Sequence, residues 1–197
     1  MRNTTPILFF ILLFVLSSCK PNLSSVATTN EQGVFQAIIE IPAGTNLKLE
    51  YSKDKKTIEP DQQNGQDRRI DFLPYPANYG FIPGTLMDKE DGGDGDPLDV
   101  FILSEQVPSG TVLPIQPIAV LNVKDEGALD TKIIAIPHDP KLRVMKAENF
   151  TDFMTEYHMA QQILQTWVLS YKGLGTTEFL GWEDEKAANK LIEKFRE

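Results

Sequence analysis

The sequence has few cysteines and few basic residues. Cys19 is the only cysteine among 197 residues, so an intramolecular disulfide is excluded. Lys and Arg number 19 against 28 Asp and Glu, and the formal net charge is -9. Affinity for nucleic acid comes chiefly from Lys and Arg that neutralise phosphates. The charge balance therefore argues against a nucleic-acid-binding protein and makes cations the expected partners.

No apolar run is long enough to cross a bilayer, which takes ~20 residues in a helix. The ten residues from Ile7 to Leu16 form an apolar segment that follows Arg2 and precedes Leu16-Ser17-Ser18-Cys19. This order is typical of a signal peptide and resembles a bacterial lipoprotein signal, in which Cys19 would be lipidated. We expect a lipoprotein signal peptide at 1–18, followed by a lipidated Cys19 and a flexible polar tether at 19–33. The protein would then be exported and lipid-anchored to a bacterial membrane, on its periplasmic or cell-envelope side.

Residues 34–197 are long enough for one domain with a sizeable core, and they contain no internal repeat. Most of this domain consists of short strand-like segments separated by Gly, Pro and Asp turns, a pattern that predicts a small barrel or a coiled sheet. The segment 74–84 has too many prolines for a central strand and is predicted to be a fixed loop that presents two tyrosines. The predicted strands are 34–41, 47–53, 100–103, 111–123 (interrupted by prolines) and 132–136. Alternation of apolar and polar residues in 47–53 places Lys48 and Glu50 on one face. Asn64-Gly65 marks a turn.

The C-terminal third changes to a helical period. Apolar residues recur every three or four positions from a predicted N-cap at Asn149 to Gly173, which predicts one amphipathic helix. A shorter helix is predicted from about Asp184 to Phe195, with acidic residues in its first turn. Both helices are expected to be structural elements that pack on the sheet.

An acidic loop from Asp91 to Val100 holds four carboxylates and three glycines. Such crowding raises carboxyl pKa values unless cations lie between the groups, so a hard divalent cation is the simpler explanation. A solvated turn is the alternative, because Asp-Gly clusters are common in turns. An EF-hand is excluded, because Leu98 and Asp99 would occupy its fifth and sixth positions. Pro97 and the lack of tandem repeats exclude a calcium-binding β-helix.

A second acidic cluster, Asp125, Glu126 and Asp130, makes a cation site formed by two loops plausible. Positively charged and tyrosine side chains at strand edges, loop ends and a helix terminus suit a multiply charged anion, since metals bridge phosphate oxygens and Lys, Arg and Tyr bind the outer ones. These side chains are Lys48, Arg68, Lys132, Lys172, Tyr79 and Tyr171.

The segment Asp94-Gly95-Asp96-Pro97-Leu98-Asp99-Val100 resembles the Asp-x-Asp-Pro-hydrophobic-Asp-hydrophobic signature of the soluble family I inorganic pyrophosphatases. Six supporting motifs occur in family order, and the resemblance covers nearly all of Val34 to Phe195. The motifs are Ile39-Glu40-Ile41-Pro42-Ala43, Lys48-x-Glu50, Tyr75-Pro76-x-Asn78-Tyr79-Gly80, Asp125-Glu126 with Asp130-x-Lys132, Tyr171-Lys172, and Gly181-Trp182-Glu183.

The resemblance implies an α+β, mainly β, fold: a small twisted five-stranded OB-like barrel flanked by two C-terminal helices. It implies hydrolysis of inorganic diphosphate to two orthophosphates by metal-activated water, with several Mg²⁺ ions in the site and a role in phosphate metabolism. It also implies a homohexamer. Diphosphate would be the substrate, nucleic acid would not bind, and the lipid would be the only membrane contact.

The resemblance also assigns roles to residues, with Asp96 as the general base and Asp99 as a ligand that bridges two metal ions. The spacing leaves open whether Arg68 or Arg69 contacts phosphate. The expected metal ligands are Asp94, Asp99, Asp125, Asp130 and Glu50; the phosphate contacts are Lys48, Arg68, Tyr79, Tyr171 and Lys172; the supporting residues are Glu40, Glu126, Lys132 and Tyr75.

Two other classes of protein are alternatives. A structural metal-binding lipoprotein would keep the acidic loops without needing Lys48, Arg68, Tyr79 and Tyr171. A nucleic-acid-binding barrel would need a basic face with stacking aromatic residues, which the charge of -9 argues against.

Overall fold

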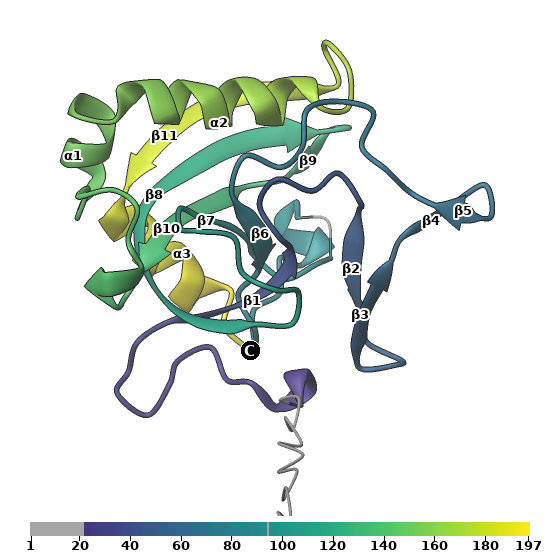
Figure 1. Ribbon diagram of the computed structural model, residues 1–197, viewed down its shortest axis with the longest axis horizontal. Coiled ribbons are helices and arrows are strands. Elements are labelled where there is room, and N and C mark those ends of the chain that lie inside the picture. The colour runs from purple at the N-terminus through teal and green to yellow at the C-terminus, as the bar shows by residue number, and fades with distance from the viewer. Residues whose placement is uncertain (1–21, 94) are drawn as a thin grey trace, which may run out of the picture.

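The computed structural model describes residues 22–93 and 95–197. Five strands of this part close into a barrel, in which each strand pairs with the next and the last returns to the first (Figure 1). All five pairings are antiparallel except that of β7 and β10. The closed ring confirms the predicted five-stranded barrel. In ring order the strands are β1 (Gln36–Ile41), β6 (Asn78–Phe81), β7 (Asp99–Ile102), β10 (Lys132–Pro137) and β8 (Val112–Asp125).

The remaining elements extend the barrel or pack on it. Strands β9 (Ala128–Leu129) and β11 (Thr177–Asp184) pair with β8. The α-helices are α1 (Phe150–Thr155), α2 (His158–Ser170) and α3 (Glu185–Lys194). The 3-10 turns are η1 (Leu23–Ser25), η2 (Lys89–Asp91) and η3 (Pro140–Leu142).

Neighbouring residues of the barrel strands enter two separate apolar clusters, because successive side chains of a strand point to opposite faces. Ile134 of β10 packs in the cluster that includes residues of α1 and α2, whereas Ile133 packs in the cluster that includes residues of α3. Both side chains are fully buried, and burial of an aliphatic side chain of this size contributes about 1.5–3 kcal/mol. Packing on both faces therefore holds the barrel strands in place, together with the polar residues at their ends.

Two small hairpins project from the barrel on one side (Figure 1). The first pairs β2 (Leu49–Ser52) with β3 (Thr57–Pro60), and the second pairs β4 (Gln62–Gln63) with β5 (Gln66–Asp67). The second hairpin turns at Asn64-Gly65, where both residues have positive φ (55° and 75°). The sequence predicted this turn, because Asn-Gly favours two-residue hairpin loops.

The prediction of a fixed loop at 74–84 was wrong in its centre. Residues 78–81 form β6, a buried strand between β1 and β7. Pro76 and Pro83 lie outside these four residues, so they delimit the strand without removing any of its hydrogen-bond donors. Gly80 is required within it, because a Cβ atom at this position would lie 1.9 Å from the backbone oxygen of Ile38.

Two other boundaries also differ from the predictions. Strand β8 runs continuously over 14 residues, and Pro117 lies at an irregularity in its pairing with β10, where a missing N–H is tolerated.

The single helix predicted from Asn149 is divided into α1 and α2, because Tyr157 leaves the helical conformation (φ -119°, ψ 25°). Asn149 does cap α1, accepting a hydrogen bond from the backbone N–H of Asp152 at 2.9 Å. The sequence did not predict strand β11.

Part of the segment expected to be a flexible tether packs on the domain. Thr28 is 4% exposed, and its backbone oxygen accepts a hydrogen bond from Gln36 N at 2.9 Å. Arg196, next to the C-terminus, donates to the Thr29 hydroxyl at 3.3 Å. The predicted signal peptide and Cys19 lie outside the described residues. Within the described part of the chain, no helix is long and apolar enough to span a membrane.

Candidate active site

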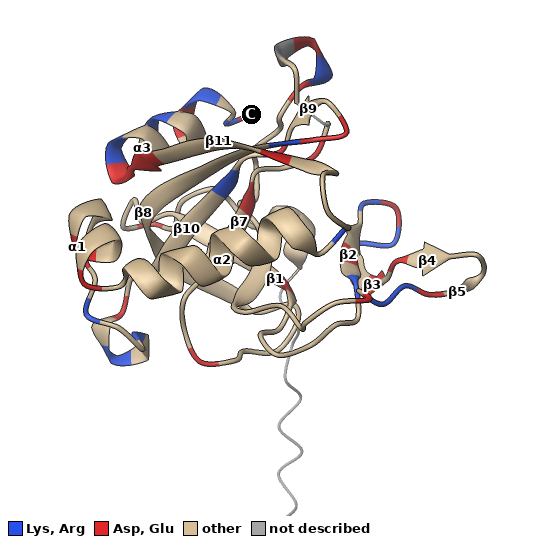
Figure 2. Ribbon diagram, turned by 90° about the horizontal axis from the view of Figure 1, so that it is seen from above, with Lys and Arg blue, Asp and Glu red and all other residues tan. Residues whose placement is uncertain are grey.

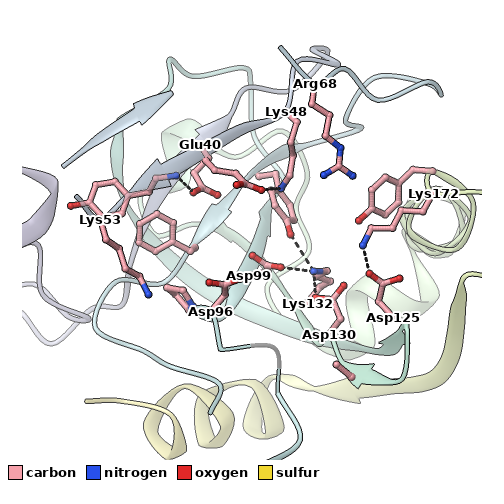
Figure 3. A pocket seen from close by; sticks show the side chains of 17 residues that line it. Glu40, Lys48, Lys53, Arg68, Asp96, Asp99, Asp125, Asp130, Lys132 and Lys172 are labelled. Atoms are coloured by element: carbon pink, nitrogen blue, oxygen red, sulfur yellow. Dashed lines mark hydrogen bonds and ion pairs between the residues drawn. The ribbon is translucent and has the colours of Figure 1, made fainter. Parts of the chain in front are cut away.

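The polar residues singled out in the sequence meet in one pocket with a volume of about 290 Å³. It opens at one end of the barrel, between the β2–β3 hairpin, the acidic loop and the C-terminal end of α2 (Figure 3). Its lining includes most of the predicted site residues: Glu40, Lys48, Glu50, Arg68, Tyr79, Asp96, Asp99, Asp125, Asp130, Lys132, Tyr171 and Lys172.

Lys132 lies at the centre of this pocket. Parallel pairing of β7 and β10 places it directly beside Asp99. Its side chain is 5% exposed. The ammonium group donates to the carboxylates of Asp99 and Asp130 and to the Tyr79 hydroxyl at 3.2 Å (Figure 3). Burial alone would lower the pKa of Lys132, but the two carboxylates outweigh it and raise the pKa. The ammonium group is therefore charged at any physiological pH.

Asp125 and Lys172 form a second ion pair across the pocket, from the end of β8 to the residues after α2. Tyr171 precedes Lys172 and stacks on Trp167, with ring centroids 4.6 Å apart and planes at 4°. Burial raises the pKa of the Tyr171 hydroxyl, and burial also raises the pKa of Tyr79. Both phenols keep their protons at neutral pH and can donate hydrogen bonds to an anion.

A third group consists of Glu40, Lys48 and Glu50. Lys48 and Glu50 lie on one face, as the alternation of residues 47–53 predicted, with Nζ and Oε1 3.3 Å apart. Glu40 is 8% exposed and accepts a hydrogen bond from the backbone N–H of Tyr51 at 2.7 Å. Burial raises the pKa of the Glu40 carboxyl to about 8, despite the nearby ammonium group of Lys48. At neutral pH this carboxyl group is therefore mostly protonated in the folded protein.

The structure separates the two candidate arginines. Arg68 lines the pocket, and its Nη1 lies 3.0 Å from Oδ2 of Asp61. Arg69 is not part of the lining, and its Nη1 donates to the side chain of Asn46 at 3.1 Å. Arg68 is therefore the arginine available to a ligand in this pocket.

Backbone hydrogen bonds hold the acidic loop to Met87, which precedes it. Met87 N donates to Asp96 O at 2.9 Å, and Gly95 N donates to Met87 O at 2.9 Å. Gly93 fits closely, because a Cβ atom there would lie 2.5 Å from Met87 O. Asp96 and Asp99 line the pocket, whereas the predicted ligand Asp94 lies outside the described residues. Among the described residues, no three acidic, His or Cys side chains lie close enough together to bind one metal ion.

Two predicted supporting residues do not line the pocket. Tyr75 is buried behind it, with its ring 5.3 Å from that of Tyr79 and 4.5 Å from that of Trp167. Glu126 is exposed at the β8–β9 turn, where its φ is 50°. Tyr75 can thus fix the position of Tyr79, whereas Glu126 does not line the pocket within one chain.

Some lining residues were not predicted, and Lys53 is the charged one among them. It lies at the start of the β2–β3 turn and is exposed. Four other Lys and Arg side chains of the lining are paired with carboxylates, but Lys53 has no carboxylate within 4.0 Å among the described residues. Sequence alternation assigned it to the end of a strand, so no periodic signal could have identified it. The other unpredicted lining residues are Tyr51, Phe81, Pro97 and Ala128.

The molecule is an OB-like barrel whose pocket is lined by both carboxylates and positively charged side chains. These features define its class: a protein that binds a small polyanion together with metal cations. Comparison with known proteins makes the class specific. A family model described as inorganic pyrophosphatase matches residues 37–197.

Individual proteins agree with this match. The inorganic pyrophosphatase of Campylobacter jejuni is 34% identical over 179 residues, covering 88% of this chain and 96% of its own length. That of Mesorhizobium japonicum is 37% identical over 177 residues, covering 86% and 93%. The crystal structure of the Thermus thermophilus inorganic pyrophosphatase superposes with a TM-score of 0.74 at 29% identity, covering 89% of this chain and 97% of that one. The chain belongs to the inorganic pyrophosphatase family.

Proposed function

We propose that this protein hydrolyses inorganic diphosphate to two orthophosphates. The observation that carries the proposal is the group around Lys132, where a buried ammonium lies between Asp99, Asp130 and the Tyr79 hydroxyl. Around it, Lys48, Arg68, Tyr171 and Lys172 surround a pocket large enough for a small anion. A protein that only bound metal would not need these donors.

The chain's own residues divide into two roles. The cationic and hydroxyl side chains bind and orient phosphate oxygens, which is most of what phosphoryl transfer requires. Asp96 lines the same pocket and would accept the proton of the attacking water. No covalent nucleophile is needed, and so the absence of a catalytic cysteine is consistent with the reaction.

We infer that the cofactor is Mg²⁺. Asp99, Asp125 and Asp130 offer carboxylate oxygens, the ligands that Mg²⁺ prefers, and each has a positively charged lysine as its partner. Mg²⁺ is usually bound by one or two carboxylates together with waters and substrate phosphates, so a cluster of three protein ligands is not required. Glu50 and Asp94 would complete the set of ligands. When bound, Mg²⁺ would neutralise phosphate charge and lower the pKa of a bound water.

Phosphate release from diphosphate by the purified protein tests the activity. We expect release with Mg²⁺ and none with excess chelator. Asp96→Asn should lower the rate about 10²–10⁴-fold, the usual contribution of a general base. Asp88→Asn is the control, because Asp88 lies just before the acidic loop and caps η2 outside the pocket. Absence of Mg²⁺-dependent release from the unmodified protein would refute the function. Full activity of Asp96→Asn would refute only the role of the base.

We also propose that Cys19 is lipidated and that the protein is anchored to a bacterial membrane on its periplasmic or cell-envelope side. The support is the order of Arg2, an apolar run and Leu16-Ser17-Ser18-Cys19. Labelling with a radioactive fatty acid is expected for the unmodified protein and not for Cys19→Ser. Label that persists in Cys19→Ser would refute lipidation at this residue.

Finally, we propose that the protein forms a homo-oligomer, a hexamer by resemblance to the family. Support comes from α2, whose exposed face carries apolar and uncharged side chains, including Met159 and Ile163, each 58% exposed. Figure 2 shows α2 on the outside of the barrel without any Lys, Arg, Asp or Glu.

A further inference from the structure

We propose that Asp61 is a positioning residue, which holds the guanidinium of Arg68 toward the pocket and so prepares it for phosphate. The inference rests on the proposed function, because Arg68 would contact diphosphate. Asp61 itself does not line the pocket and therefore acts through Arg68.

The backbone around Asp61 is hydrogen-bonded to both Lys48 and Arg68, the two residues expected to contact phosphate near the β2–β3 hairpin. Lys48 N donates to Arg68 O at 2.9 Å, Asp61 N donates to Lys48 O at 3.0 Å, and Arg68 N donates to Asp61 O at 2.8 Å. Each of the three residues is thus bonded through the main chain to the other two. Lys48 and Arg68 cannot move apart without breaking this triangle of hydrogen bonds.

The Asp61 side chain completes the arrangement. Its Oδ2 lies 3.0 Å from Nη1 of Arg68, with side-chain exposures of 23% and 31%. An arginine has five N–H donors, so one bond to Asp61 leaves others available for phosphate oxygens. A long side chain loses rotamer freedom when it binds a ligand, and prior restriction of that freedom strengthens binding. Asp61 therefore favours diphosphate binding by restricting Arg68 in advance.

The β4–β5 hairpin lies between Asp61 and Arg68 in the sequence and brings them together. Its two strands pair Gln62 with Asp67, and Gln62 Nε2 donates to Asp67 Oδ1 at 2.7 Å. Asp67 is exposed and contacts neither Arg68's guanidinium nor the pocket, among the interactions of the described residues. It offers a matched control: it is the same residue type, it lies at the other end of the hairpin that Asp61 precedes, and it is next to Arg68 in sequence.

Steady-state kinetics of the purified, Mg²⁺-loaded protein tests the proposal. For Asp61→Asn we expect the KM for diphosphate to rise roughly five- to twentyfold while kcat changes less than about threefold, since the loss is in binding. Asp61→Glu, which keeps the charge, should have an intermediate KM, and Asp67→Asn should match the unmodified protein. In an Arg68→Gln background, Asp61→Asn should raise KM less than about twofold further.

Several results would overturn the inference. The first is an unchanged or lower KM for Asp61→Asn, or an equal rise in KM for Asp67→Asn. The second is an equal KM for Asp61→Asn and Asp61→Glu. The third is a rise in KM on Asp61→Asn that is as large in the Arg68→Gln background as in the unmodified protein. Thermal unfolding of every variant shows whether the fold is kept, and a KM rise in Asp61→Asn that merely follows lost stability also counts against Asp61. An inactive unmodified protein would refute the proposed function and, with it, this inference; an active one confines the failure to Asp61.

Discussion

Glu40 shows how burial changes the charge state of a single residue in this pocket. Its carboxyl group is enclosed by the barrel and faces Lys48, the N–H of Tyr51, Asp99 and Glu50. Desolvation is the largest influence on its pKa, and the two carboxylates add to the effect of burial. A protonated Glu40 adds no negative charge to a pocket that would receive diphosphate.

Glu40 should make the stability of the metal-free protein depend on pH. Its pKa is about 8 in the folded protein and 4.5 in a model peptide, so the folded state binds more protons between these values. The contribution of Glu40 to the free energy of unfolding therefore falls as pH rises from about 4.5 to about 8. Glu40→Gln resembles the protonated carboxyl and should remove this contribution, so its stability relative to the unmodified protein should increase with pH across that range.

Denaturant unfolding in the presence of chelator at several pH values measures this difference. Glu31→Gln is the control, because Glu31 is exposed. A difference between Glu40→Gln and the unmodified protein that does not change with pH would show that Glu40 is ionised in the folded state.

The sequence predicted residues of the site best where local geometry determines their placement. Lys48 and Glu50 share a face because strands have a period of two, and the structure confirms this. The choice between Arg68 and Arg69 depends on which guanidinium meets Asp61 and which meets Asn46. The first contact depends on the hairpin that closes between Asp61 and Arg68, and the second joins residues 23 positions apart, so the pattern around Arg68-Arg69 could not make the choice.

At the scale of elements, Asn78 explains why a proline-rich segment contains a buried strand. Its side chain is fully buried and makes four hydrogen bonds, which connect β6 to two loops. Oδ1 accepts from the backbone N–H groups of Ala43 and Val107, and Nδ2 donates to Ser104 Oγ and Glu105 O. These tertiary contacts stabilise a strand that its four residues would not form alone, and composition therefore suggested a loop.

Strand β10 shows an element that the sequence predicted well. Residues 132–136 are aliphatic except for Lys132, and every residue of the strand is buried. Its apolar run marks a central strand, but its pairing partners are not local information. The parallel pairing with β7, which places Lys132 beside Asp99, is a property of the closed barrel. The strand could thus be predicted, whereas the contact most important for the site could not.

For the whole molecule, the acidic net charge and the neutral helix α2 bear on assembly. Copies with a net charge of -9 repel one another, and this repulsion is weakest where two faces without charges meet. Charged residues of the described chain lie on α1, α3, the hairpins and the loops as well as in the pocket, whereas α2 has no Lys, Arg, Asp or Glu (Figure 2). The exposed face of α2 is therefore the surface on which we expect copies of this chain to meet.

A charge placed on α2 should weaken this assembly. Ile163→Glu puts a carboxylate in the centre of the exposed face, and its desolvation in an interface would cost several kcal/mol unless it is paired. We expect the unmodified protein to sediment as an oligomer of the 22.1 kDa chain and Ile163→Glu to sediment as a smaller species. Asn189→Glu, on the exposed face of α3, adds the same charge and should leave the mass unchanged. A monomeric unmodified protein would refute the oligomer, and an unchanged mass for Ile163→Glu would show that copies meet on another face.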